Sequence, residues 1–332
     1  MNADRFSESV SLAADFSVDR SALSGDVEPL VAILMATYNG ERYLREQLDS
    51  IIGQHHQNWI LVVSDDGSAD NTRNLVEQYQ ARLGRARVCL LDGPRQGFAS
   101  NFLSLCCEQA IEADYFAFCD QDDVWQPHHL KQALLQLSES PSNLPALYCG
   151  RTNLTDEQGV PYGSSPLFSK AACFRNALVQ SIAGGNTMVF NAPARQLVQS
   201  AGRVNIVSHD WWLYMLISGA GGRVFYSPEA TVNYRQHGGN LVGANTGLRN
   251  RLHRVKRMFD GHLKDWNELN LAALDQCWSM LSEPNQQTLQ LLKDARHASL
   301  LRRINGLLRS RVYRQTFMGN VGLMGATLLK KL

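Results

Sequence analysis

The chain of 332 residues lacks the apolar stretches that cross a membrane. No apolar run approaches the ~20 residues that a transmembrane helix needs. The first 28 residues lack the basic start and apolar centre of a secretory signal. They are rich in Ser, Asp and Ala, so we expect residues 1–28 to form a disordered leader. These absences predict a cytoplasmic protein.

The sequence also has little that indicates disulfides, zinc or a dinucleotide. Its seven Cys are an odd number, and most lie inside apolar segments. We therefore expect buried free thiols in a reducing compartment. No Cys/His spacing is typical of zinc, and no G-x-G-x-x-G follows the first predicted strand, which disfavours a dehydrogenase. No recognised nucleic-acid motif is present, so nucleic acid is not an expected partner.

What the chain does contain is a set of strands that end in polar loops. Apolar runs at 30–36, 59–63 and 115–119 predict buried strands, and each is followed by a loop and then a helical pattern. This is the layout of an open α/β sheet, in which ligands bind beyond the carboxyl ends of the strands. The loops are Thr37-Tyr38-Asn39-Gly40-Glu41, Asp65-Asp66-Gly67-Ser68 and Asp120-Gln121-Asp122-Asp123.

The third loop places three carboxylates within four residues. Such a cluster is costly unless a positive charge lies against it. A divalent cation that carries a diphosphate would fit, because hard oxygen ligands suit Mg or Mn. The alternative is a helix start, where free N–H groups favour Asp, and Pro127 suits a first helical turn.

Together these loops resemble glycosyltransferase family 2, which has a GT-A fold. The form Asp-Gln-Asp-Asp-Val-Trp at 120–125 resembles the family's bacterial rhamnosyltransferase branch. Two later segments fit the same branch, and the resemblance covers roughly residues 31–243. It implies a GT-A type, Rossmann-like mixed α/β sheet flanked by helices. The later segments are Ser208-His209-Asp210-Trp211-Trp212 and Tyr234-Arg235-Gln236-His237-Gly238-Gly239-Asn240.

The resemblance implies a nucleotide over the first two strand ends. Thr37 and Tyr38 can flank a pyrimidine and its ribose, and Asp65 or Asp66 would accept a hydrogen bond from the base N3–H. The alternative for this Asp pair is a plain Asx turn before Gly67. The resemblance places Arg95 next to the nucleotide, and the alternative is a solvated surface charge. The full predicted nucleotide-binding set is Thr37, Tyr38, Asn39, Glu41, Asp65, Asp66, Arg95, Asn101, Asp120 and Arg235.

The remaining site residues follow from the same resemblance. Asp122 and His237 would bind the metal, although a lone His is often structural. Asp210 would be the catalytic base, and its alternative role is the N-cap of the helix that follows. His209 is expected to be structural, and Asp123 is either a further ligand or a helix cap. The predicted acceptor-side loop is Gly184, Gly185 and Asn186.

A change in composition marks a boundary near Asn245. We expect a catalytic domain over 29–245 and a basic helical region over 246–332. From Arg249 to Leu332 the net charge is +9, while the rest of the chain carries −8. This region indicates either a solvated helix face or peripheral attachment to an anionic membrane, with the apolar stretch 318–329 in the interface.

The leading hypothesis is an inverting glycosyltransferase that uses dTDP-L-rhamnose to extend a lipopolysaccharide or related surface glycan. Its partners would be the nucleotide sugar and a glycan or lipid-linked acceptor at the cytoplasmic face of the inner membrane. One alternative is a family relative that uses another nucleotide sugar, such as a UDP-hexose. Another is a catalytically degenerate protein that binds membrane or nucleic acid through its basic tail.

Overall fold

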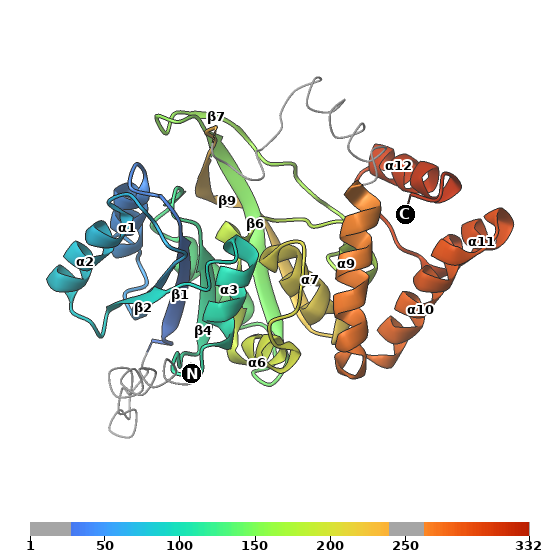
Figure 1. The fold of residues 1–332 in the computed structure, drawn as a ribbon, viewed down its shortest axis with the longest axis horizontal. Coiled ribbons are helices and arrows are strands. Elements are labelled where there is room, and N and C mark those ends of the chain that lie inside the picture. Colours follow the sequence, from blue (N-terminus) through green and yellow to red (C-terminus); the bar gives the residue numbers. More distant parts are fainter. Residues whose placement is uncertain (1–27, 239–261, 332) are drawn as a thin grey trace, which may run out of the picture.

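The computed structural model describes residues 28–238 and 262–331 (Figure 1). The expected leader lies outside these residues except for Glu28. So do Gly239 and Asn240 and the basic run that begins at Arg249. No helix in the described ranges is long and apolar enough to span a bilayer.

A single mixed sheet forms the centre of the molecule. Its strands follow the order β3-β2-β1-β4-β8-β6-β9-β5, with β7 added beside β6. The first four are parallel, and β8 then pairs antiparallel with both β4 and β6. The strands are β1 Val31–Thr37, β2 Trp59–Asp65, β3 Val88–Asp92, β4 Tyr115–Cys119, β5 Val124–Trp125, β6 Ala146–Thr155, β7 Pro161–Ser164, β8 Val189–Asn191 and β9 Arg223–Arg235.

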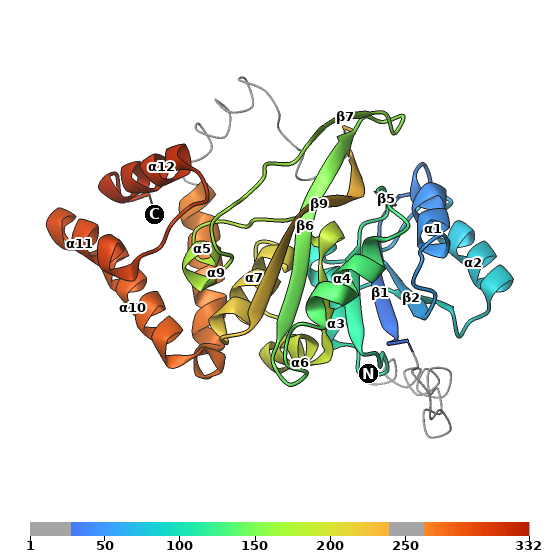
Figure 2. The ribbon, with the colours of Figure 1, turned by 180° about the vertical axis from the view of Figure 1, so that it is seen from behind.

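Helices cover both faces of the sheet, as Figures 1 and 2 show from opposite sides. Alternate residues of β1 divide between two cores: Val31, Ile33 and Met35 pack with α1, α2 and α4, whereas Ala32 and Leu34 pack with α3, α6 and α7. A strand buried on both faces is apolar throughout, which is why the run was recognisable. These helices are α1 Leu44–Ile52, α2 Thr72–Leu83, α3 Phe98–Cys107, α4 His129–Leu137, α6 Ala192–Ala201 and α7 His209–Gly219.

The three predicted strands are confirmed as β1, β2 and β4, and the second half of the sheet contains pairings that no apolar run indicated. β6 continues to Thr155 and pairs with β7. β9 is one continuous strand. Its register against β6 skips Pro228 and Glu229, so a bulge absorbs the proline that interrupts the apolar pattern.

The C-terminal helices pack onto the sheet domain rather than apart from it. Leu274 of α9 (His262–Gln276) and Leu289 of α10 (Glu283–His297) belong to the same apolar core as α7 and α5 (Phe174–Ala177). Asn285 donates to the carbonyls of Ser218 and Gly219 at the end of α7. Beyond α10, α11 (Leu300–Ser310) and α12 (Phe317–Leu328) form the end of the molecule farthest from α2 (Figure 1).

Candidate active site

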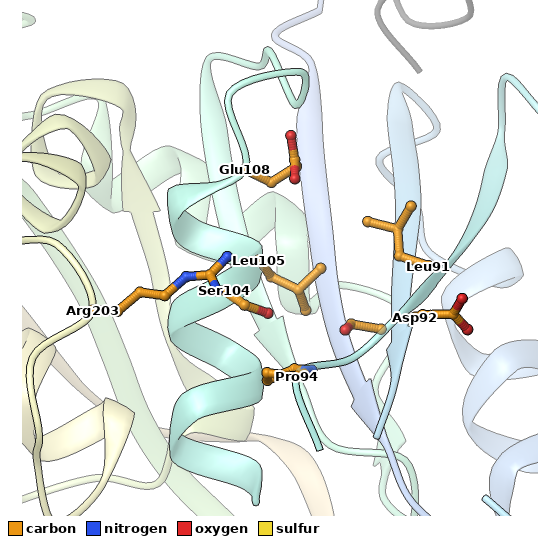
Figure 3. Close-up of a pocket in the computed structure, with 8 residues that line it drawn as sticks. Leu91, Asp92, Pro94, Ser104, Leu105, Glu108 and Arg203 are labelled. Carbon is orange, nitrogen blue, oxygen red and sulfur yellow. The ribbon is translucent and has the colours of Figure 1, made fainter. Parts of the chain in front are cut away.

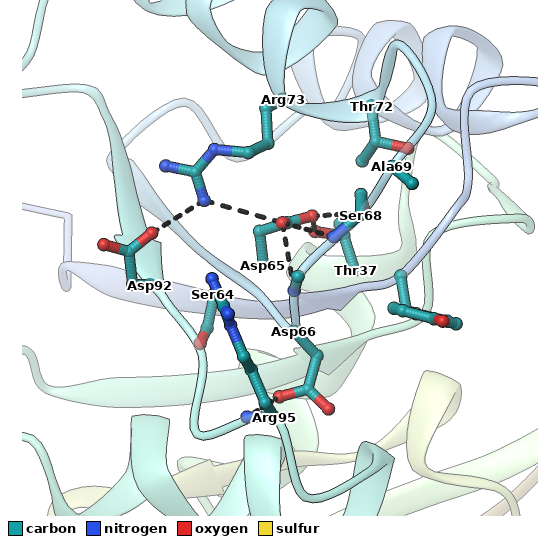
Figure 4. A network of polar contacts seen from close by, with 12 residues as sticks. Thr37, Ser64, Asp65, Asp66, Ser68, Ala69, Thr72, Arg73, Asp92 and Arg95 are labelled. Atoms are coloured by element: carbon teal, nitrogen blue, oxygen red, sulfur yellow. Dashed lines mark hydrogen bonds and ion pairs between the residues drawn. The ribbon is translucent and has the colours of Figure 1, made fainter.

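Asp65 organises the loop at the carboxyl end of β2 (Figure 4). Its buried carboxylate accepts hydrogen bonds from the Thr37 hydroxyl at 2.9 Å and from the Ser68 amide and hydroxyl at 2.9 and 2.6 Å. Burial would raise the pKa of Asp65, but hydrogen bonds from Ser68, Thr37 and Gly67 outweigh it and hold the pKa below its ordinary value. Asp65 therefore stays charged and joins the first two strand ends.

Asp66 fixes the loop that follows β3 through hydrogen bonds, as Asp65 fixes the loop that follows β2. Its two carboxylate oxygens accept from the backbone amides of Arg95 and Gly97, at 2.6 and 2.8 Å. Arg95 has a φ of 57° and its side chain lies over Gly67, where an added Cβ would come within 3.2 Å of Nε. The exposed Arg95 guanidinium thus stands beside the Asp65–Asp66 turn, where the predicted base would bind.

Asn101 lies deeper than the sequence suggested. It is buried, its amide donates to the Ser64 carbonyl at 2.8 Å, and its side-chain oxygen accepts from the Ser64 hydroxyl at 2.5 Å. Its amide group is thus engaged inside the protein, where it anchors α3 to the end of β2.

Gln121 connects the first loop to the acidic loop. Its side chain accepts from the Tyr38 amide at 2.9 Å and donates to the Tyr38 carbonyl at 3.0 Å. A glycine at position 40 leaves room for this contact, because an added Cβ would displace the Gln121 amide group. Tyr38 itself is 59% exposed, so its ring is available to a ligand.

Asn39 and Glu41 complete the first loop by contacting the second. Asn39 adopts a φ of 48°, and its side-chain oxygen accepts from the Ala69 amide at 2.8 Å. Glu41 accepts from the Asn71 amide at 2.7 Å through one carboxylate oxygen. Both side chains are exposed at the edge of the sheet, as a role beside the nucleotide requires.

The acidic loop concentrates negative charge beyond β4. Burial, together with the neighbouring carboxylates of Asp122 and Asp210, raises the pKa of Asp120 to about 8. Asp210 comes from the first turn of α7, so the two segments meet although 90 positions separate them in the sequence. A cation at this point would relieve the mutual repulsion of the carboxylates.

Asp123 is neither a helix cap nor exposed to solvent. Its fully buried carboxylate accepts from the side-chain amide of Asn186 at 2.5 Å and from the Arg235 backbone amide at 3.1 Å. Burial, with Asp122 and Asp120 nearby, raises the pKa of Asp123 well above its ordinary value. Asp123 thus ties the predicted acceptor loop to β9, and the side chain of Asn186 points inward to it.

The predicted metal ligands lie next to each other. Nε2 of His237 is 2.7 Å from Oδ2 of Asp122, and the His237 ring packs 4.8 Å from the ring of Tyr43. Mg²⁺ is usually held by one or two carboxylates plus substrate phosphates, and Mn²⁺ accepts imidazole as well, so this donor pair fits either ion. Within residues 28–238 and 262–331, no three His, Cys, Asp or Glu side chains gather as a metal cluster.

Arg235 holds the acidic loop in place through its side chain. Its guanidinium is buried and donates to the Asp122 carbonyl at 3.1 Å, the Glu157 carbonyl at 2.9 Å and the Glu46 carboxylate at 2.6 Å. It also lies 4.8 Å from the Tyr43 ring centroid. These contacts position the residue that would hold the metal.

Asp210 is partly exposed, and its neighbour His209 is not. One oxygen of Asp210 accepts from the Trp211 amide at 2.6 Å, and the helix N-cap is Ser208. The His209 ring stacks on Phe102 at 3.8 Å, and neither ring nitrogen has a hydrogen-bond partner among the described residues. Burial lowers the pKa of His209 to about 4, although Asp210 acts in the opposite direction. His209 is therefore a neutral residue whose packing against Phe102 holds the start of α7 on α3.

The acceptor-side loop lies against that histidine. Gly185 opens a short 3-10 turn, η2 (Gly185–Thr187), and a Cβ there would fall 2.3 Å from Nε2 of His209. A Cβ at Gly184 would meet the side-chain oxygen of Asn186 at 2.7 Å. Gly185 thus lets the backbone approach α7, and Gly184 leaves room for the inward side chain of Asn186.

A small cleft opens beside these loops, between β3 and α3 (Figure 3). It adjoins the carboxyl end of β2 through Ser64, but none of the predicted site residues lines it. The lining residues are Ser64, Leu91, Asp92, Pro94, Ser104, Leu105, Glu108 and Arg203.

Sequence reasoning missed the residues that support the site. Gln121 lies between acidic residues and was not among the predicted site residues, and Glu46 belongs to α1. Arg73 contacts both Asp65, at 3.5 Å, and Asp92, at 2.8 Å (Figure 4). Only the polarity of Gln121 within a metal-like loop could have indicated its role, because the other contacts depend on tertiary structure.

Fold and site together define the class of protein. The mixed α/β sheet with polar loops at its carboxyl edge and C-terminal helices is a GT-A fold. The family model for "Glycosyl transferase family 2" matches residues 32–198, which is half of the chain. The chain belongs to this family.

Curated relatives extend the match. The chain is 32% identical over 232 residues to dTDP-rhamnosyl transferase RfbG of Shigella flexneri, covering 67% of this chain and 78% of that protein. It is 25% identical to the putative teichuronic acid biosynthesis glycosyltransferase TuaG of Bacillus subtilis, covering 58% and 74%. Among solved structures, S. aureus TarS 1-349 aligns with a TM-score of 0.52 and 14% identity over 91% of this chain and 87% of that one. The last comparison supports the fold alone.

Proposed function

We propose that the protein is an inverting glycosyltransferase that transfers L-rhamnose from dTDP-L-rhamnose to a bacterial surface glycan or its lipid-linked precursor. The observation that supports the proposal is the acidic loop itself, where Asp122 lies 2.7 Å from His237 and where Asp210 is near enough to help raise the pKa of Asp120. The rhamnose donor is supported by the relation to a dTDP-rhamnosyl transferase at 32% identity.

The exposed residues of the three strand ends would bind the nucleotide. The Arg95 side chain lies over Gly67, beside the Asp65–Asp66 turn where the pyrimidine would lie, and the exposed Tyr38 ring follows the neighbouring strand end. Thr37, Asp65 and Asn101 are buried, so their part is to hold these loops in place. Such preorganised positioning supplies much of the rate enhancement in a transfer reaction.

Asp122 and His237 would hold a divalent ion, Mg or Mn, which neutralises the departing diphosphate when bound. Arg235 fixes the backbone of Asp122, and Asp120 would contact the ribose or a metal-bound water. The anion-rich loop alone would repel a diphosphate, which is the physical reason to expect a cation in this site.

Asp210 would accept the proton of the acceptor hydroxyl as that oxygen attacks the anomeric carbon. The new glycosidic bond forms on one face of the sugar while the bond to the diphosphate breaks on the other, and the diphosphate leaves with the bonding electrons. A single displacement inverts the anomeric centre, so a β-linked donor gives an α-rhamnoside. The Gly184–Gly185 segment would lie along the acceptor.

We propose that transfer takes place at the cytoplasmic face of the inner membrane, where lipid-linked acceptors would be reached. The net charge of +9 over the last 84 residues supports attachment to an anionic surface.

The test is a hydrolysis and transfer assay with dTDP-L-rhamnose, UDP-glucose, UDP-galactose and GDP-mannose in the presence of Mn²⁺. We expect the rhamnose donor to react fastest and NMR of the product to show an α-rhamnoside. A β-rhamnoside would reject the single displacement. If dTDP-L-rhamnose does not react, the assignment of rhamnose as the donor sugar is wrong. If a UDP-hexose reacts faster, that hexose is the donor sugar instead.

A variant tests the base. Asp210→Asn keeps the shape of the side chain but cannot take a proton, so we expect turnover to fall by about 10²-fold or more. Calorimetry should show donor binding close to that of the wild type. Asp294→Asn, an exposed change on α10, is the matched control. If Asp210→Asn abolishes donor binding instead, Asp210 is a binding residue.

A further inference from the structure

The last two helices expose apolar side chains where a helix normally presents polar ones. Eight of the fifteen large apolar residues exposed in the described part of the chain fall within residues 300–329. In a water-soluble protein, such a concentration marks a surface that is covered by something else. The eight are Leu300, Leu301, Leu308, Phe317, Met318, Val321, Leu328 and Leu329.

The periodicity of α11 separates two faces. Leu301 and Leu308 are 80% and 61% exposed and lie two turns apart on one face. Arg303, Leu307 and Ser310 lie on the opposite face and are buried against the protein. The apolar residues on the outer face therefore do not serve the protein's own core.

α12 repeats the same arrangement. Phe317, Val321 and Leu328 follow the i, i+4, i+11 spacing of one helix face and are exposed. The buried side of α12 contains Leu323, Ala326 and Thr327. The guanidinium of Arg303 donates to the Thr327 carbonyl at 3.0 Å, so the two helices are joined directly.

The charged residues of the segment that contains this apolar surface have one sign. From residue 295 to the end, the sequence contains eight Lys and Arg and no Asp or Glu. Arg302 and Arg309 are exposed on α11, and Lys330 is exposed just beyond α12. Exposed leucine and phenylalanine on a segment that contains basic residues and no acidic ones complement a bilayer with anionic headgroups.

The position of the two helices suits that partner. In Figures 1 and 2 α12 lies toward the same edge of the molecule as the carboxyl ends of β1 and β2, where the active-site loops are. A protein resting on α11 and α12 would therefore keep its site close to the bilayer surface.

We propose that the outer faces of α11 and α12 form a membrane-docking surface that inserts its apolar side chains between anionic lipids. The docking surface comprises Leu301, Leu308, Phe317, Val321 and Leu328, with Arg302, Arg309 and Lys330 beside them. It does not depend on which sugar the site transfers.

The test compares binding of full-length variants to sedimented vesicles. Leu301→Ser, Leu308→Ser and Phe317→Ser combined should weaken binding to phosphatidylglycerol-containing vesicles at least tenfold. The control combines Leu135→Ser, Val160→Ser and Leu167→Ser, which are exposed apolar residues elsewhere, and should bind as the wild type does. Because all forms keep residues 239–261, any contribution of that segment is common to them.

A second pair of variants tests the contribution of the basic residues beside the docking surface. Arg302→Gln with Arg309→Gln should weaken binding to anionic vesicles, and the control Arg85→Gln with Lys131→Gln should not. Wild-type binding to pure phosphatidylcholine vesicles should be weaker than to anionic ones. The proposal is overturned if the triple serine variant binds anionic vesicles as the wild type does, or if the wild type binds none. It is equally overturned if light scattering shows that the surface joins two copies of the chain.

Discussion

Two side chains from distant parts of the chain, Asp122 and His237, form the predicted metal pair. We expect Asp122→Ala to abolish transfer and to weaken Mn²⁺-dependent nucleotide binding at least tenfold, which is about 1.4 kcal/mol. The physical reason is the loss of the carboxylate that holds the ion against the diphosphate.

Calorimetry of dTDP binding with and without Mn²⁺ measures this effect. Binding without metal should change little, and the melting temperature should stay close to that of the wild type. Asp294→Ala is the control, because it removes an exposed carboxylate far from the site. Transfer activity within about twofold of the wild type would remove Asp122 from the metal site.

His209 should make the protein sensitive to acid. Burial lowers its pKa from the ordinary 6.5 to about 4, so between these values the unfolded chain binds more protons than the folded one. The contribution of neutral His209 to the free energy of unfolding is complete above pH 6.5 and is lost as the pH falls toward 4. At pH 5 the loss attributable to His209 is about 2 kcal/mol.

Urea unfolding at pH 7.5 and pH 5 tests this expectation. The wild type should lose stability between the two conditions, and His209→Leu should lose about 2 kcal/mol less. His129, whose pKa burial lowers to about 3, acts in the same direction in both proteins. An identical loss in wild type and variant would show that His209 is already charged in the fold.

At the scale of elements, the site depends on how closely the η2 turn approaches α7. Gly185→Ala would place a Cβ 2.3 Å from Nε2 of a histidine that is confined by Phe102 and Phe118. The ring cannot move away easily, so we expect a loss of about 1–3 kcal/mol, typical of overpacking.

Thermal and urea unfolding of Gly185→Ala measure this cost. Gly163→Ala on β7 is the matched control, because no atom in the described part of the chain lies within 4 Å of the added Cβ there. Equal stability of the two variants would mean that η2 and α7 adjust freely to each other.

At the scale of the whole molecule, the C-terminal region and the catalytic domain share a core. Ser282 and Asn285 donate to the end of α7, and a Cβ at Gly219 would come within 2.7 Å of Leu281. A chain that ends at Gly247 would expose the apolar residues of α5 and α7 that α9 and α10 cover.

We therefore expect truncation after Gly247 to lower the melting temperature strongly or to make the protein insoluble. Differential scanning calorimetry and soluble yield measure this. Asn285→Ala in the full chain should give a smaller loss, near the 1 kcal/mol of a hydrogen bond. A truncated chain that unfolds cooperatively at the wild-type temperature would show that the catalytic domain is independent. For this reason membrane docking is tested with point variants.

The sequence by itself determined the elements whose chemistry is local. The strands β1, β2 and β4 were recognisable because strands buried on both faces are apolar throughout, and their loops because each polar run begins where such a strand stops. The family followed from motifs whose residues lie close together in the chain. The carboxylates at 65, 66, 120, 122 and 210 could be named for that reason.

Only the tertiary structure decided which of the predicted side chains have their polar groups engaged within the protein. Asn101 and Arg235 looked like nucleotide contacts, but their polar groups are engaged by Ser64 and by the acidic loop, because burial requires every polar group to find a partner. The continuity of β9 across Pro228 depended on its pairing with β6. The outer faces of α11 and α12 likewise became apparent only from packing, because an amphipathic pattern does not tell which of its faces the rest of the chain covers.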